Sequence, residues 1–194
     1  KLEDCQLFLF CDASFAGDLL DSLSTSGTVL CICGPNTFHP ISWICKKQGA
    51  VSHSSTEAEL IAMDAGMRME ALPALDLMDL ALHVFHPPKS NRAQTDPPST
   101  QVQTGSPFNV DWVPTNMNVP KGRAKLLILE DNDAVIKMCN KQRSPMMRHV
   151  TRTHRVDLDW IFERIHTDKC IRPRYINTKQ QIADIFTKGS FTES

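Results

Sequence analysis

Long apolar segments are missing from this 194-residue sequence. No run approaches the roughly 20 residues that a membrane-spanning helix needs. The first residues, KLEDCQ, have neither the basic nor the apolar region of a secretory signal peptide. We therefore expect an intracellular fragment of a longer protein, with no membrane partner.

Paired Cys-x-x-Cys motifs are also absent, although the sequence contains seven cysteines. Most of them lie inside apolar, strand-like runs, which favours reduced, buried thiols over disulfides. Cys31 and Cys33 lie on one strand face, but no histidine or further cysteine follows at a ligand spacing. A structural zinc site at these two thiols is therefore not expected.

The chain has no large net charge, since its formal value is −1, and 41% of its residues are hydrophobic. This composition excludes a wholly disordered chain. The charges are distributed unevenly, however. Residues 1–120 contain 6 Lys and Arg against 13 Asp and Glu, and residues 121–194 contain 15 against 9. The C-terminal part therefore presents either a surface that faces a polyanion or solvated helix faces.

The first half of the sequence changes from strand patterns to a helical pattern. Apolar runs separated by turn residues predict three antiparallel strands at 5–14, 25–34 and 39–47. Helical spacing begins at Ser54, and Pro73 should kink that helix or start a new one. Residues 86–124 lose this periodicity and are rich in Pro, Ser, Thr and Gln. We interpret them as a disordered or extended insertion in one domain of residues 1–194.

Order returns in the second half with further apolar runs. These predict strands at 124–131 and 171–178, helices at 132–141 and 148–168, and a closing helix that carries Asp184. The sequence therefore predicts an α/β protein with a mixed five-stranded sheet, in which three antiparallel strands are followed by two parallel ones. Helices should cover both faces of this sheet.

Carboxylates follow two of the predicted strands. Asp12 ends the first strand, Asp131 ends the fourth, and Glu59 lies in the first turns of the helix between them. Each alone is readily explained as a turn former or a helix cap. Together they indicate a site for hard cations, because clustered carboxylates repel one another unless a cation holds them. Two Mg²⁺ ions, or Mn²⁺ in their place, would support hydrolysis of a phosphodiester.

Six stretches resemble a known family: FLFCDASFAGD, STSGTVL, ISWICKKQGAVSHSSTEAEL, LEDNDAVI, RHVTRTHRVDLDWIFERI and YINTKQQIADIFTKG. Together they resemble the ribonuclease H domain at the end of the Ty1/copia-type retrotransposon polyprotein. The resemblance covers nearly the whole chain except residues 86–124. It implies a ribonuclease H-like fold, and SSTEAEL and QIADIFTKG are its most specific motifs in combination.

The resemblance also implies a catalytic set of four metal-binding carboxylates, Asp12, Glu59, Asp131 and Asp184, with two Mg²⁺ ions and no small-molecule cofactor. Glu57, two residues before Glu59, would then stabilise the helix N-terminus through the macrodipole. The implied partners are an RNA–DNA hybrid, whose RNA strand is cut, and the reverse transcriptase domain of the same polyprotein. The implied location is the cytoplasm, in a virus-like particle, or the nucleus.

The basic stretch near the C-terminus supplies candidate nucleic-acid contacts at Arg148, His149, Arg152, His154 and Arg155. Lys141, Arg143 and residues 46–48 are further candidates for phosphate contacts. Either histidine could also protonate a leaving group, pack a helix or face a phosphate. Two alternatives to an active ribonuclease H stay open. One is a degenerate domain that only binds nucleic acid or has a structural role, and the other is another two-metal nuclease of the same fold.

Overall fold

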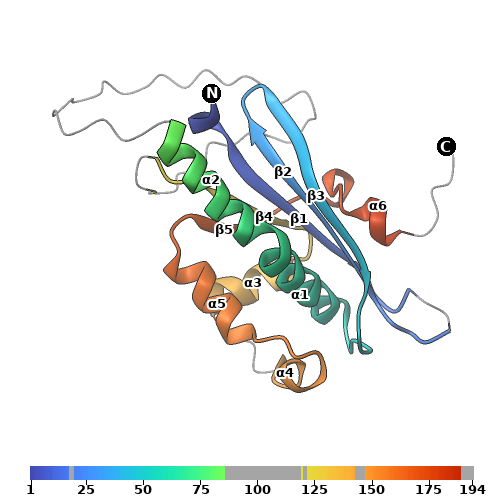
Figure 1. The fold of residues 1–194 in the computed structure, drawn as a ribbon. Helices are drawn as coiled ribbons and strands as arrows, with labels where there is room; N and C mark the ends of the chain where they lie inside the picture. The colour runs from blue at the N-terminus through green and yellow to red at the C-terminus, as the bar shows by residue number, and fades with distance from the viewer. Residues whose placement is uncertain (18–19, 86–118, 120–121, 143–146, 189–194) are drawn as a thin grey trace, which may run out of the picture.

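The structure is a computed structural model, and it describes residues 1–17, 20–85, 119, 122–142 and 147–188. A five-stranded sheet forms its centre, with helices on both sides (Figure 1). The spatial order of the strands is β3-β2-β1-β4-β5. The predicted α/β class is therefore confirmed.

Three long strands follow a short 3-10 turn at Leu2–Asp4: β1 (Gln6–Ser14), β2 (Thr25–Gly34) and β3 (Thr37–Lys47). They pair antiparallel in chain order, whereas β4 (Leu126–Glu130) pairs parallel with β1, and β5 (Ile171–Tyr175) pairs parallel with β4. The predicted mixed sheet, with three antiparallel strands and then two parallel ones, is confirmed. Its parallel part places the C-terminal ends of β1 and β4 side by side.

The two faces of the sheet have separate cores, because side chains alternate along each strand. Leu7, Leu9 and Cys11 of β1 lie in the larger core, and Phe8 and Phe10 lie in the smaller one on the other face. Both faces of β1 are thus buried, which explains its nearly continuous apolar sequence.

The helices α1 (Ser55–Gly66) and α2 (Leu72–Phe85) pack on the larger core. The Ser54 side chain caps α1 by accepting a hydrogen bond from the Glu57 backbone N–H. A π-helical segment, Met67–Ala71, joins the two helices, and Pro73 is the second residue of α2. Because proline has no N–H to donate to the preceding turn, this wider turn fits the predicted break at Pro73.

One predicted helix is two in the structure. The stretch 148–168 forms α4 (Val150–Thr153) and α5 (Leu158–Thr167), after α3 (Asp133–Lys141). Arg155 has a positive φ of 58°, and the Asp157 side chain accepts a hydrogen bond from the Trp160 N–H to start α5 anew. The prediction of one helix was therefore wrong, because the apolar spacing is similar on both sides of this break.

The C-terminal segment of the described chain covers the other face of the sheet. A short 3-10 turn (Thr178–Gln180) leads into α6 (Asp184–Thr187), where Ala183, Ile182 and Phe186 pack on the smaller core. Figure 1 shows α6 on the side of the sheet opposite to α1 and α2. Helices on both faces are therefore confirmed.

The predicted insertion, residues 86–124, lies mostly outside the described residues. Its last part, however, belongs to the fold: Ala124 is buried, and its backbone N–H donates to the Asp79 carboxylate at 2.6 Å. The Arg123 side chain also binds Asp79, at 2.8 Å. Arg123 and Ala124, at the end of the predicted insertion, are thus bound to Asp79 of α2. No helix within the described ranges is long and apolar enough to span a membrane.

Candidate active site

Three of the predicted carboxylates meet at the C-terminal end of β1. Asp12 comes from β1, Glu59 from the second turn of α1, and Asp131 directly follows β4. One oxygen of each lies within 4.8 Å of the others. The parallel pairing of β1 with β4 explains why residues more than a hundred positions apart in sequence come together.

Asp12 is buried, and its surroundings disfavour the charged form. Burial raises its pKa to about 6; the Thr187 hydroxyl, which donates to Oδ2, opposes this effect, and the charge of Asp184 adds to it. A carboxylate with such a pKa releases its proton readily when a cation arrives.

Glu59 is perturbed more strongly. Burial is the largest cause, followed by the charges of Glu130 and Asp12, and together they raise its pKa to about 10. Its Oε2 atom is buried and has no hydrogen-bond partner among the residues that the structure describes. The metal-free protein therefore keeps Glu59 protonated near neutral pH, and its second oxygen is available as a ligand.

Asp184 begins α6 and lies beside Asp12, whose pKa its charge raises. Its Oδ2 atom pairs with the Lys188 ammonium group. Its other oxygen, Oδ1, is buried without a hydrogen-bond partner in the described part of the chain. The fold thus brings the fourth predicted carboxylate to the edge of the same centre, with a cation that balances its charge.

Two residues that sequence reasoning missed hold α6 in place. Gln181 is buried, and its Nε2 donates to the backbone carbonyls of Cys11 at 2.7 Å and Leu129 at 3.4 Å. It therefore joins the ends of β1 and β4 directly before Asp12 and close to Asp131. At Gly27 of β2, an added Cβ would lie 2.7 Å from Thr187 Cγ2 and 3.0 Å from the Ala183 carbonyl oxygen. Only glycine permits this close approach of α6.

A further acidic residue, Glu130, was also missed. It is the last residue of β4, it is fully buried, and burial raises its pKa well above the usual value. Its Oε1 accepts a hydrogen bond from the Asn132 N–H, but Oε2 has no partner in the described ranges. The sequence LILED contains two adjacent acids, and only the second, Asp131, was predicted from the end of the apolar run.

The donor set fits hard divalent cations. It consists of carboxylate oxygens, and two of them, on Glu59 and Asp184, are buried without a hydrogen bond from the described residues. Unpaired, buried carboxylates are costly, and coordination to Mg²⁺ or Mn²⁺ satisfies such oxygens. Asp12, Glu59 and Asp131 are the residues placed to hold a cation, with Asp184 next to Asp12.

The five predicted nucleic-acid residues fall into two groups. Arg148, Arg152 and Arg155 have exposed side chains, as a contact to phosphates requires. His149 and His154 instead approach the buried Glu57 carboxylate, at 3.0 and 2.9 Å. The His154 side chain is only 2% exposed, so the structure gives it a buried position and not a surface one.

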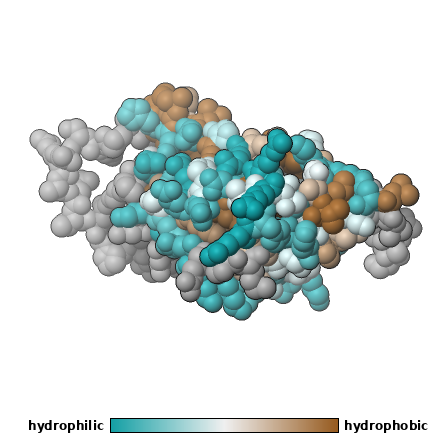
Figure 2. Space-filling model, turned by 90° about the horizontal axis from the view of Figure 1, so that it is seen from below, coloured by the Kyte–Doolittle hydropathy of each residue, from teal (hydrophilic) through white to brown (hydrophobic). Residues whose placement is uncertain are grey.

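The other candidates for phosphate contacts also differ in exposure. Lys46 and Lys141 are exposed, whereas Gln48 is buried and donates to Ser26 and to the Ala58 carbonyl oxygen. Arg143 lies outside the described residues. Figure 2 shows that the lower face of the molecule is predominantly hydrophilic, with separate apolar areas.

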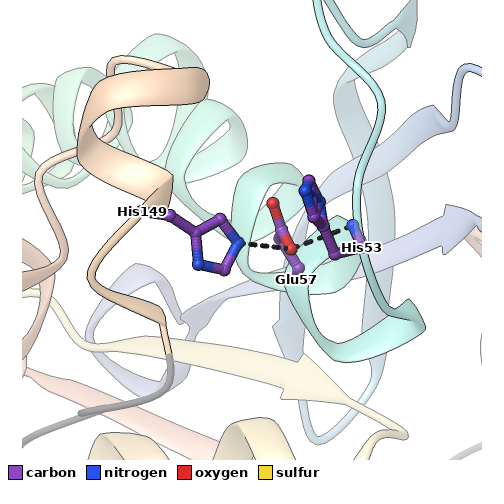
Figure 3. Close-up of side chains that lie close together, drawn as sticks. All are labelled: His53, Glu57 and His149. Atoms are coloured by element: carbon purple, nitrogen blue, oxygen red, sulfur yellow. Dashed lines mark hydrogen bonds and ion pairs between the residues drawn. The ribbon is translucent and has the colours of Figure 1, made fainter.

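Glu57 has more contacts than the expected interaction with the helix dipole. Its carboxylate accepts a hydrogen bond from the His53 backbone N–H at 3.0 Å and another from His149 Nε2 at 3.0 Å (Figure 3). The hydrogen bond from the His53 N–H, together with the cap formed by Ser54, agrees with a role of Glu57 at the helix N-terminus. The histidine contacts could not be predicted, because they join segments 92 residues apart.

Comparison with known proteins gives two curated relatives. These are the "Retrovirus-related Pol polyprotein from transposon RE2" and that "from transposon RE1", both of Arabidopsis thaliana, and each is 37% identical over 83 residues. The aligned part covers 42% of this chain and 5% of each relative. No family model and no solved structure matches. The resemblance to a retrotransposon polyprotein is confirmed by these relatives: part of this chain is similar to a short part of retrotransposon Pol polyproteins.

Proposed function

We propose that this chain is a metal-dependent ribonuclease H domain that cleaves the RNA strand of RNA–DNA hybrids during retrotransposon reverse transcription. The observation that carries the proposal is the meeting of Asp12, Glu59 and Asp131 within 4.8 Å, with Asp184 beside Asp12. The mixed five-stranded sheet and the similarity to Pol polyproteins support it. The reverse transcriptase domain of the same polyprotein is the proposed partner, in the cytoplasm or nucleus.

Asp12, Glu59 and Asp131 would hold Mg²⁺, whose charge would activate a water and stabilise the leaving oxygen of the phosphodiester. The residues of the chain hold and orient that charge. Gln181 fixes the ends of β1 and β4, so the carboxylates of Asp12 and Asp131 keep their separation. Thr187 orients Asp12 through its hydroxyl group, and Lys188 pairs with Asp184. Preorganised carboxylates of this kind need little rearrangement when the substrate binds.

The choice of an RNA–DNA hybrid requires a surface that senses the 2′-hydroxyls in a wide, shallow minor groove. Arg148, Arg152 and Arg155 are exposed on and beside α4 and are the proposed phosphate contacts. These contacts position the hybrid, and the distance from a phosphate contact to the carboxylates then selects the bond that is cut.

Incubation of the chain with an end-labelled RNA–DNA hybrid, with and without MgCl₂, tests the proposal. We expect Mg²⁺-dependent cleavage of the RNA strand, which Asp131→Asn should abolish and which Asp76→Asn, at an exposed position on α2, should leave unchanged. Cleavage of plain duplex DNA would indicate a different two-metal nuclease. A folded chain that binds the hybrid without cutting it at any Mg²⁺ or Mn²⁺ concentration would indicate a degenerate domain.

A further inference from the structure

A second cluster of ligand-type side chains lies at the start of α1. It consists of His53, Glu57, His149 and His154, which we call the histidine cluster. One ligand atom each of His53, Glu57 and His149 lies within 4.8 Å of the others. Figure 3 shows the His53 and His149 side chains on either side of the Glu57 carboxylate, from two separate segments of the chain. Their ring centroids are 4.9 Å apart.

Two buried atoms of this cluster are not satisfied by hydrogen bonds. The Glu57 side chain is fully buried, and His154 is 2% exposed. Glu57 Oε1 and His154 Nε2 lie 2.9 Å apart, within ion-pair distance, but the two atoms are not aligned for a hydrogen bond, and neither makes one to any other residue that the structure describes. A buried carboxylate without an aligned hydrogen bond at one oxygen has unused capacity for a cation, and the nearby His154 imidazole can hold that oxygen in place once a cation is bound.

We propose that the histidine cluster binds a Zn²⁺ ion through Glu57, His53 and His149, with His154 next to the second carboxylate oxygen. The set of two imidazoles and one carboxylate is typical of zinc sites that leave a fourth position open. Mg²⁺ is a poor competitor here, because it prefers oxygen ligands. The site is therefore chemically distinct from the carboxylate centre at Asp12.

The observed distances require only a small rearrangement. Ligand atoms that share a tetrahedral Zn²⁺ at 2.0–2.1 Å lie about 3.3 Å apart. Glu57 Oε2 and His149 Nε2 are 3.0 Å apart and need to separate slightly, and His53 lies at the exposed edge, where its ring can move inward. His154 stays buried beside Oε1 and orients the carboxylate, as outer-shell partners of zinc ligands do.

The ion would tie together parts of the chain that only side chains now join. His53 and Glu57 belong to the start of α1, whereas His149 directly precedes α4. Arg148 and Arg152, two of the proposed phosphate contacts, flank His149 closely in sequence. Binding of Zn²⁺ would therefore fix the position of these arginines relative to α1. This effect does not require that the carboxylate centre be catalytic.

Metal titration of the full chain tests the proposal, with millimolar MgCl₂ present so that the carboxylate centre is occupied by Mg²⁺. We expect one equivalent of Co²⁺ to give the visible absorption of a four-coordinate site, without thiolate charge-transfer bands, and Zn²⁺ to displace it. Zn²⁺ should also raise the unfolding midpoint by mass action. His154→Gln should weaken Zn²⁺ binding about 10- to 100-fold, as is typical of outer-shell partners, and His53→Gln at least as much.

Single-histidine variants distinguish Zn²⁺ binding at the histidine cluster from binding elsewhere on the chain. His53 is exposed, so His53→Gln leaves the core intact, and His39→Gln at an exposed position on β3 is the matched control. Equal Zn²⁺ affinity in wild type, His53→Gln and His149→Gln would overturn the proposal. Thiolate bands that persist in His53→Gln would assign the metal to cysteines and also overturn it. So would an unfolding midpoint that does not respond to Zn²⁺.

Discussion

Glu57 and Glu59 lie two residues apart on α1, and their carboxylates belong to two different clusters. Successive helical residues are about 100° apart around the axis, so these two side chains leave the helix in nearly opposite directions. Glu57 meets His149 and His154, and Glu59 meets Asp12 and Asp131. Isosteric substitution of each glutamate therefore tests one cluster without removing the other.

Glu59→Gln should abolish cleavage of the hybrid and leave stability unchanged. The loss should exceed about 100-fold, because even outer-shell partners of a metal cost 10- to 100-fold. With its pKa raised to about 10 by burial, Glu59 is protonated in the metal-free protein at neutral pH, and glutamine has the same shape. Single-turnover cleavage and urea unfolding in the presence of a chelator measure the two effects. Cleavage retained by the variant would place the active site elsewhere.

Glu57→Gln should lower the stability of the fold and leave cleavage of the hybrid nearly unchanged. It removes the anion that accepts hydrogen bonds from the His53 backbone and from His149 inside the fold. We expect a loss of about 2 kcal/mol in the free energy of unfolding, the usual scale for a buried polar group that loses its partner. Glu163→Gln, at an exposed position on α5, is the control. A variant as stable as wild type would mean that the histidine contacts contribute nothing to the fold.

Mg²⁺ should stabilise the fold through the carboxylate centre. The charges of Asp12 and Asp131 oppose the ionisation of Glu59, and a cation that binds only the folded state raises the unfolding midpoint by mass action. The measurement is the midpoint against MgCl₂ at constant ionic strength. The response should disappear in Asp12→Asn and Asp131→Asn and persist in the exposed control Asp76→Asn. An equal response in all four proteins would assign the effect to weak binding at the surface.

Gly27→Ala should lower the cleavage of the hybrid, although Gly27 is not one of the carboxylate ligands. The new methyl group would lie 2.7 Å from Thr187 Cγ2 and 3.0 Å from the Ala183 carbonyl oxygen, so α6 must move away from β2. Because α6 carries Asp184, we expect cleavage to fall by about 10- to 100-fold, the cost of losing the support of a metal ligand. Gly49→Ala is a matched control, since nothing lies within 4 Å of its added Cβ. Full activity in Gly27→Ala would show that the position of α6 is unimportant.

The strands and the carboxylates of the centre were predictable because their signals are local. Nearly continuous apolar runs mark β1 and β4, and Asp12 and Asp131 follow from the ends of those runs. The break at Arg155 was not predictable, because the apolar spacing continues across it. The contacts of Gln181 and of Glu57 could not be predicted either, since they join residues 170 and 92 positions apart. Such long-range polar contacts have no periodic signature in a sequence.

The last prediction concerns Asp64, a buried carboxylate on α1 away from both clusters. Burial raises its pKa, and the hydrogen bond and charge of Arg68, 2.7 Å away, oppose this only in part. Arg68 in turn lies 3.6 Å from the centre of the Trp160 ring on α5, so the pair joins two helices. The ionised form of Asp64 is therefore less favourable in the folded state than in the unfolded state.

The sign of the pH dependence follows from this raised pKa. The stability that protonated Asp64 contributes is complete below the unfolded pKa of about 3.9 and is lost as the pH rises through the higher folded pKa. Asp64→Asn resembles the protonated form and does not titrate. The free energy of unfolding of the variant minus that of wild type should therefore increase with pH, by at most about 1.4 kcal/mol per unit, and become constant above the folded pKa. Urea unfolding across this range with a chelator present measures the difference. A difference that falls with rising pH would show that Arg68 outweighs burial and that Asp64 is stabilised as the anion.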